Sequence, residues 1–595
     1  MAIKFLCRGI AARRARSSRL CIFAFLIFML MGCAQQGSLL SGPNAPLGVD
    51  QQTGIIPAVG ENSQTDFSSL DPAQAGDRAS LLVTNMTSTG LVSLDNKLQV
   101  RPQLATSYTA TDGGLTWTFT LKPGLMFNDG SHLTAQDVIY SLNRALQPLT
   151  ASPTASTFLG AIKDADKLRS GQVQTLIGDS LLAPDERTVI IKLAQPDLSF
   201  LSALSNSCAF VVKKQLVERY GSDWTSHMSE GGSSGPWFIE HSIKQATRYI
   251  VLKPNSHYYG AKPRLNKAIV TFYINAQTVY RAYEANQVDI APVPASLMAR
   301  ARGLGGSQLR QTPGLLTYYY ALNYLVKPLD NIKVRQALAL AINKDVLART
   351  IYDGTMRPTN NIIPSGIPGY APTLTGPDGV TTTMGNEQRS RQLLDEGLQE
   401  EGLTRDVFRN INFEVYSGIP SDANIKDEYN AIRTMWKDVL NIDVRINDVN
   451  GAKYYGDIQN TLNNPQGLGI WRLSWNVDYP DPHATLAPQF GRGTPNNAQN
   501  YGQNSASDSS QQQETQAMMA QADSIADQQQ RYSRYAEIEQ RLINDVAWIP
   551  LFQNVKSFVV KPCLQGWNIS ALDQLPPDDW SGVYLSKNGA CAHNV

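Results

Sequence analysis

The sequence predicts an α/β protein built from more than one domain, and three observations lead to this. A chain of 595 residues is too long for one core, because domains usually hold roughly 100–200 residues. Residues 412–446 read as a strand, a helix and a second strand, and the length of this crossover suits parallel pairing. Other short segments alternate apolar and polar residues between turn signals, as strands do.

Local patterns predict the individual elements. Strand-like segments bounded by Pro, Gly, Asp or Asn indicate hairpins and mixed sheet: 115–121, 188–193 and 249–252. A helix is predicted over 134–146, because Thr134 is followed three residues later by Asp137 in a capping-box arrangement. Two more amphipathic helices are predicted over 334–342 and 428–440.

The N-terminus has the pattern of an export signal. Lys4 and five arginines within residues 1–19 precede an apolar run, 20–31, that is too short to span a bilayer comfortably. The following Leu30-Met-Gly-Cys33 resembles the lipobox of bacterial lipoproteins, which predicts a lipid on Cys33. The alternatives are an uncleaved anchor or an ordinary signal peptide, and both also place the remaining chain outside the cytoplasm.

Two segments are predicted to lack regular structure. Residues after Cys33, up to about 64, are rich in Gly, Pro, Ser and Gln and are expected to form a flexible tether. Residues 494–516 are rich in Asn, Gln and Ser and are expected to form an exposed loop. No later segment has the roughly 18 consecutive apolar residues of a membrane span, so a soluble body is expected.

The cysteines permit one disulfide. Cys7 and Cys21 would leave with the signal, so an exported chain keeps Cys208, Cys563 and Cys591 besides the lipidated cysteine. A bond between Cys563 and Cys591 closes the shortest loop. Cys208 would then be a small buried side chain.

Charge and motifs exclude several classes of function. The chain has 52 basic and 51 acidic residues and a net charge of +1, so no overall field would attract nucleic acid or an anionic membrane. His-Glu-x-x-His, Gly-x-Ser-x-Gly, the phosphate-binding loop motif and Cys-x-x-Cys are all absent from the sequence. We therefore expect a protein that is not an enzyme and that needs no metal or other cofactor.

The most informative segment is 471–482. Its apolar, aromatic first half predicts a buried strand, which ends in an acidic corner (residues 477–482) that holds Asp478 and, between two prolines, Asp481. Carboxylates at the mouth of a lobe suit a cation. The alternatives at this corner are a metal site with His483 and an acid/base pair of the two aspartates. His483 is expected to be a solvated loop residue, and the corner offers no nucleophile.

Six sequence blocks, in order along the chain, resemble one family. The blocks are Leu70-Asp-Pro72 with Gly90-Leu-Val92, Thr111 to Val138, Gly235-Pro-Trp237, Asn255 to Gly260, Asn323 to Leu338, and Trp475 to Pro482. From about Asp66 to Trp567 the chain resembles the extracytoplasmic solute-binding proteins of ABC importers, in particular the oligopeptide/dipeptide-binding group, family 5.

This resemblance implies a periplasmic-binding-protein-like fold of type II: two α/β lobes joined by a hinge, with an extra subdomain on the first lobe. The domains it implies are a signal peptide 1–32, a lipidated tether 33–64, lobe I from 65–82, 195–322 and 551–595, an extra subdomain 83–194, and lobe II 323–550.

The resemblance also implies site residues. Asp478 occupies the position that pairs with the α-ammonium of a peptide, while Trp475 and Tyr479 would line the first side-chain pockets. The alternatives are a carboxylate that braces its own corner and rings that only pack in the core. Arg78 lies in a loop placed like one that binds the ligand backbone, although it departs from the small or apolar residues expected there. Asp481 is assigned to turn chemistry.

The function expected from the sequence is that of a lipid-anchored, monomeric binding protein outside the cytoplasm, at the cell surface or in the periplasm. It would capture short peptides and deliver them to the permease subunits of an ABC importer. Other solutes on the same scaffold, such as nickel chelates or sugars, are the first alternative. A secreted hydrolase that uses Asp478 and Asp481, or a tethered sensor, is a more distant one.

Overall fold

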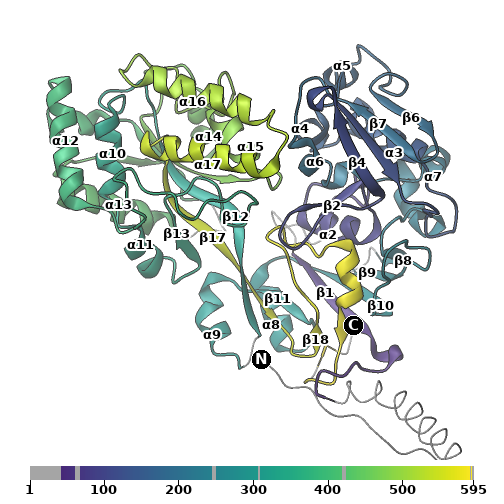
Figure 1. Cartoon of the computed structure of the whole chain (residues 1–595). Helices are drawn as coiled ribbons and strands as arrows, with labels where there is room; N and C mark the ends of the chain where they lie inside the picture. The colour runs from purple at the N-terminus through teal and green to yellow at the C-terminus, as the bar shows by residue number, and fades with distance from the viewer. Residues whose placement is uncertain are drawn as a thin grey trace, which may run out of the picture.

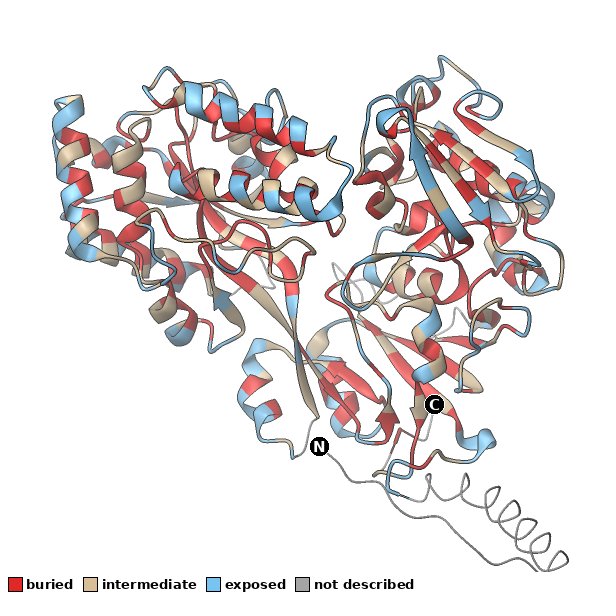
Figure 2. Cartoon of the chain, in the orientation of Figure 1, coloured by how far each residue is buried: buried red, intermediate tan, exposed pale blue. Residues whose placement is uncertain are grey.

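A computed structural model describes residues 42–59, 67–243, 249–305, 308–418, 424–589 and 591–592. Two α/β lobes stand side by side, and two long strands, β12 (Leu309–Leu322) and β17 (Ile549–Val560), run from lobe II down toward lobe I (Figure 1). Buried residues of each lobe gather on the sheets and on the helix faces turned toward them (Figure 2). The two-lobed α/β fold expected from the sequence is confirmed.

Lobe I is built on a sheet of the order β1-β10-β9-β8. Its strands are β1 (Thr53–Val59), β10 (Lys267–Tyr273), β9 (Tyr249–Pro254) and β8 (Trp237–Ile243), and β1 pairs in parallel with β10. The tether predicted over 33–64 is therefore wrong for residues 53–59. The strand could not be predicted because the segment is short, lies in a polar tract and contains Pro57. An edge strand such as β1 tolerates a proline.

The helices of lobe I are α2 (Arg78–Thr87), α7 (Lys214–Tyr220), α8 (Ala276–Glu284) and α9 (Met298–Arg302). Two small ribbons accompany them: β2 (Val92–Leu94) with β3 (Val100–Pro102), and β18 (Leu564–Gln565) with β19 (Tyr584–Leu585). Cys563 and Cys591 form a disulfide beside the second ribbon, and Cys208 is buried and unpaired.

The extra subdomain holds an antiparallel sheet of the order β4-β5-β7-β6. Its strands are β4 (Ala105–Thr111), β5 (Thr116–Leu121), β7 (Thr188–Lys192) and β6 (Leu181–Asp185). Helix α3 (Ala135–Leu146) has the predicted capping box of Thr134 and Asp137. The shorter helices are α4 (Ala155–Leu159), α5 (Ala165–Arg169) and α6 (Phe200–Ala203).

Lobe II contains the large sheet, which has seven strands among the described residues. Its order is β11-β17-β12-β16-β14-β15, with β13 beside β17. The strands not yet given are β11 (Ile290–Pro292), β13 (Met356–Pro358), β14 (Phe413–Val415), β15 (Ile446–Asp448) and β16 (Ile470–Asn476). β14 and β15 pair in parallel and are connected through α13 (Ile425–Leu440), which confirms the strand-helix-strand unit predicted within 412–446, with its second strand displaced to 446–448.

The other helices of lobe II are α10 (Ile332–Leu340), α11 (Lys344–Thr350), α12 (Glu387–Glu401), α14 (Gly451–Gln459), α15 (Pro482–Phe490), α16 (Ser509–Ala522) and α17 (Gln528–Asn544). β12 packs on the core of lobe I at Leu309 and on that of lobe II at Tyr319. Because one strand serves both lobes, the lobe boundary placed after residue 322 stays a prediction.

The exposed loop predicted over 494–516 is wrong. Asn497, Gln499 and Asn500 are buried, and α16 begins within the segment. The side-chain amide of Asn500 donates to Asn323 Oδ1 at 2.9 Å, and Gln512 Oε1 accepts from Asn504 Nδ2 at 2.8 Å. These amides form hydrogen bonds with the polar groups of a buried chain. A composition that is typical of exposed loops therefore belongs here to a buried segment.

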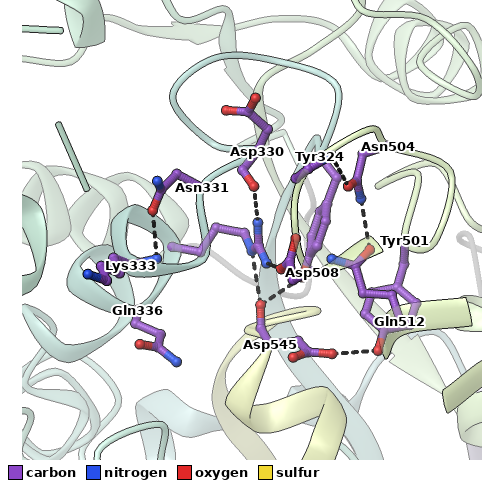
Figure 3. Close-up of polar contacts among 12 residues, drawn as sticks. Tyr324, Asp330, Asn331, Lys333, Gln336, Tyr501, Asn504, Asp508, Gln512 and Asp545 are labelled. Carbon is purple, nitrogen blue, oxygen red and sulfur yellow. Dashed lines mark hydrogen bonds and ion pairs between the residues drawn. The ribbon is translucent and has the colours of Figure 1, made fainter. Parts of the chain in front are cut away.

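A buried arginine organises the same region (Figure 3). Arg335 is fully buried, donates from Nη2 to Asp508 Oδ2 at 2.8 Å and from Nε to the carbonyl of Asp545 at 2.9 Å, and lies over the Tyr324 ring. Tyr501 Oη donates to Asp545 Oδ2 at 2.6 Å. A buried charge needs such partners, so this network holds the 497–508 segment against lobe II.

The signal 1–32 and Cys33 lie outside the described residues, so the export and lipid predictions stay predictions. Within the described part of the chain, no helix combines the length and the apolar character that crossing a membrane requires.

Candidate functional site

A cleft of about 580 Å³ lies between the lobes. Lobe I contributes Arg78 and Asn85 of α2, residues 205–207 and residues 571–574 to its walls. The strands that run between the lobes contribute Leu315 and Leu316 of β12 and Asn554 and Lys556 of β17, and lobe II contributes residues 476–480. The cleft is thus a site whose two walls come from segments far apart in the sequence.

A backbone hydrogen bond and the buried side chain of Val477 hold the acidic corner in place. β16 ends at Asn476, and the amide of Val477 donates to the carbonyl of Leu315 on β12 at 3.1 Å. The Val477 side chain is buried, while that of Asp478 is exposed and lines the cleft. Successive side chains of an extended chain point to opposite sides. The Asp478 side chain therefore points toward the cleft, while Val477 holds the corner in place.

Asp478 has no partner in the part of the chain that the structure describes: it forms neither a hydrogen bond nor an ion pair there. Solvent reaches its side chain, yet the walls of the cleft bury it enough to raise the pKa of its carboxyl. Desolvation disfavours the charged form, so a cation brought to this carboxylate would be bound strongly. The structure thus places Asp478 as a free acceptor at the cleft.

Asp481 lies three residues further on, and both of its carboxylate oxygens accept hydrogen bonds. It is buried and forms a two-pronged ion pair with Arg531, Oδ2 to Nη1 at 2.7 Å and Oδ1 to Nη2 at 2.5 Å. It also caps α15, accepting from the His483 amide at 2.9 Å. The turn role is present, but the partner, 50 residues away, was missed because sequence proximity gives no sign of it.

The expectation for His483 is wrong. The residue lies in the first turn of α15, and its Nδ1 is 2.9 Å from both carboxylate oxygens of Asp523 and 3.3 Å from Tyr535 Oη. Burial alone would lower the pKa of its imidazole, but the hydrogen bond and charge of Asp523 outweigh it, and the pKa is raised. His483 therefore braces lobe II behind the corner.

Trp475 and Tyr479 occupy different positions. Trp475 is half-buried, lies outside the lining of the cleft, and donates from Nε1 to the carbonyl of Ala484 at 3.1 Å. Tyr479 lines the cleft; its Oη is 3.2 Å from Ser199 Oγ, and its ring meets Phe158 edge-on with 6.1 Å between centroids. Phe158 belongs to the extra subdomain and Ser199 follows it, so Tyr479 joins the two sides of the cleft.

The opposite wall carries a cluster of three charges. Arg78, at the start of α2, places Nη2 2.5 Å from Asp573 Oδ2, and Lys556 places Nζ 2.6 Å from the same oxygen. Burial, the main influence, lowers the pKa of the Lys556 ammonium. Asp77 caps α2 by accepting from the Ser80 amide at 2.9 Å. Lys556 and Asp573 were not singled out from the sequence, since neither lies in a recognisable motif.

A metal-binding role finds little support among the described residues. The group of His, Cys, Asp and Glu side chains that lies close enough to hold an ion there consists of Asp289, Cys563 and Cys591. The two sulfurs of this group are joined in the disulfide. A disulfide sulfur is no longer a thiolate, which is the form of cysteine that binds metals.

Comparison with known proteins gives a consistent result. Residues 99–497 match the family model of bacterial extracellular solute-binding proteins, family 5. The periplasmic oligopeptide-binding protein OppA of Escherichia coli is 26% identical over 573 residues, which cover 94% of this chain and 98% of OppA. The periplasmic murein peptide-binding protein MppA of Escherichia coli is 28% identical over 510 residues, 84% of this chain and 88% of MppA.

Among solved structures, the unliganded open form of the murein tripeptide binding protein MppA superposes with a TM-score of 0.76. The superposition has 24% sequence identity and covers 91% of this chain and 98% of that one. The two chains therefore share a fold over nearly their whole lengths.

Proposed function

The chain belongs to the family 5 bacterial extracellular solute-binding proteins, and from this we propose that it captures short peptides between its lobes and delivers them to the permease of an ABC importer. The family consists of substrate-binding transport proteins. We accordingly propose a binding protein that carries out no covalent chemistry.

The observation that carries the peptide assignment is the carboxylate of Asp478 in the cleft, which no other described residue pairs with. A peptide offers one obligatory cation, its α-ammonium, which can donate charge-assisted hydrogen bonds to this group. In a cleft that closes on its ligand, water is excluded and such a pair is stronger than at a surface. Asp478 would thus fix the amino terminus and set the register of the peptide.

Polar side chains along the same cleft suit the rest of a peptide backbone. Asn85, Asn476, Asn554 and Gln574 line it, and amides can both donate to carbonyls and accept from amide N–H groups. Contacts of this kind bind a main chain without reading its side chains. The proposed ligand is therefore a class of short peptides.

The other predicted site residues take supporting roles in this proposal. Tyr479 would cover the first residue of the peptide from the corner, and Trp475 would hold α15 in place behind it. Arg78 keeps more than half of its side chain exposed while paired to Asp573, and its guanidinium would contact a ligand carbonyl from this wall. A lipid on Cys33 would hold this monomeric protein at the outer face of a membrane.

The test is titration calorimetry with trialanine and its N-acetylated form. We expect the wild type to bind trialanine and to lose most of the affinity for the acetylated peptide. Asp478→Asn should weaken trialanine binding about 30-fold or more, because truncating one partner of a desolvated charge pair costs about 2–5 kcal/mol.

Asp438→Asn, which alters an exposed aspartate on α13, is the matched control and should bind as the wild type does. Equal affinity for both peptides, together with full binding by Asp478→Asn, would show that the ammonium is not what Asp478 recognises.

A further inference from the structure

A second cavity, of about 130 Å³, lies in lobe I against the cleft. The two cavities adjoin, because they share wall residues: Arg78, Leu81, Leu572, Asp573 and Gln574. The smaller one is therefore separated from the ligand site only by the side chains that line both.

The walls of this side cavity are apolar. Its lining includes Ile56 and Ala58 of β1, Leu82 of α2, Ile290 of β11 and Phe558 of β17. Apolar surface of this kind gains stability when a hydrocarbon group replaces water, by roughly 25 cal/mol per Å² buried. The chemistry of the walls thus favours an apolar occupant over a charged or strongly polar one.

The size of the side cavity restricts the occupant further. An engineered cavity of roughly 150 Å³ lined by aliphatic and aromatic side chains binds benzene. At about 130 Å³, the cavity here suits one aromatic ring or one branched aliphatic side chain. A second ring system or a whole peptide unit would not fit.

Polar groups form the border between the side cavity and the cleft. They could move apart to let such a side chain enter. The ion pair of Arg78 and Asp573 lies there, and Arg78 is 58% exposed. Of the two partners Arg78 is the more exposed, since the Asp573 side chain is 21% exposed, so Arg78 is the side chain that would move to open the border. Lys556 continues to neutralise Asp573 when Arg78 moves, because both cations contact the same oxygen.

We infer that this side cavity is a specificity pocket of the ligand site, which receives one aromatic or branched aliphatic side chain of the bound peptide. The inference rests on the proposed function and adds a selectivity to it. Main-chain contacts would accept many sequences, while the pocket would favour peptides with phenylalanine or leucine at one position. Burial of such a side chain should raise affinity by about 10-fold or more over alanine.

The experiment is a phenylalanine scan by titration calorimetry on the full chain. Trialanine is compared with the three peptides in which one alanine is replaced by phenylalanine. We expect one of the three to bind about 10-fold more tightly than trialanine and the other two to gain much less.

Leu82→Trp fills the side cavity from a half-buried position and should abolish this preference while trialanine binds as before. Leu82→Met keeps the side-chain volume and should preserve the preference. Ile56→Phe fills the same space from β1 and gives a second route if the Leu82→Trp chain unfolds, as judged by circular dichroism.

The outcomes separate the pocket from the function. A wild type that binds trialanine without preference for any phenylalanine peptide would overturn the pocket, as would a filled variant that keeps the preference or that weakens all four peptides equally. A wild type that binds none of the peptides would overturn the proposed function itself, and the pocket with it.

Discussion

The two walls of the cleft handle charge in opposite ways. On the lobe I side, Arg78 and Lys556 both pair with a single carboxylate oxygen of Asp573. On the lobe II side, Asp478 has no partner from the described residues and has a raised pKa. Charges that satisfy each other stabilise a wall, whereas a carboxylate left unsatisfied is available to a ligand. The absence of a partner, more than the residue type, distinguishes the candidate site.

The same contrast appears within the acidic corner itself. Asp478 and Asp481 are three residues apart, but Asp481 is buried against Arg531 and caps a helix. We therefore expect Asp481 to contribute to stability and propose that Asp478 contributes to binding. Separate measurements of the free energy of unfolding and of peptide affinity should distinguish the roles of the two aspartates.

The largest effect is expected from Asp481→Asn. The change keeps a capping side chain but removes the two-pronged partner of the buried Arg531 guanidinium, which is left with Asp523 at 3.9 Å. Breaking a buried pair from one side should lower the free energy of unfolding by about 3–5 kcal/mol, measured by urea denaturation. Asp478→Asn should leave it unchanged or slightly higher, because its carboxylate has no partner to lose. Equal losses in both variants would remove the distinction between the two aspartates.

Local signals in the sequence predicted much of the fold. The capping box at Thr134 and Asp137 gave the start of α3, and the strand-helix-strand pattern gave β14, α13 and the parallel pairing with β15. These features depend on neighbours a few residues away, so the chain displays them directly. Asp478 could be named because it follows a predicted strand at the end of a matching sequence block.

Features that depend on distant partners could not be predicted. β1 pairs with β10, more than 200 residues later, and Arg531 reaches back to Asp481 across 50 residues. The amides around Asn500 look like surface loop chemistry until their buried partners are known. The contact of Tyr479 with Ser199 and the pairing of Asp573 with Arg78 likewise join residues that lie far apart in the sequence.

The next effect concerns the pH dependence of binding. Burial raises the pKa of Asp478 in the unliganded protein, and a bound ammonium would require the ionised form. As pH falls through this raised pKa, protons compete with the peptide, and affinity should drop by up to about 10-fold per pH unit. Titration calorimetry with trialanine between neutral and acidic pH, within the range where circular dichroism shows a folded chain, measures this.

Asp478→Asn is the control for this profile. Its weaker binding should change little over the same pH range, because the amide does not titrate and the α-ammonium of the peptide stays protonated. A variant profile that falls as steeply as the wild type would assign the pH dependence to another group.

The smallest effect is expected from Tyr479→Phe, which tests whether the lobe II wall contributes a second anchor. The change keeps the ring that meets Phe158 and removes the hydroxyl that lies 3.2 Å from Ser199 Oγ. One such neutral hydrogen bond contributes about 1 kcal/mol or less, so affinity for trialanine should change by no more than about fivefold.

Ser199→Ala should have a similar effect, and the double variant should not add the two, since both remove the same contact. The size of this loss shows which group on the lobe II wall anchors the ligand. If the hydroxyl only links the two sides of the cleft, its loss is small whichever partner is removed. If Tyr479→Phe weakened trialanine more than Asp478→Asn does, the hydroxyl would be the main ligand anchor on this wall, and the unpaired carboxylate would not be.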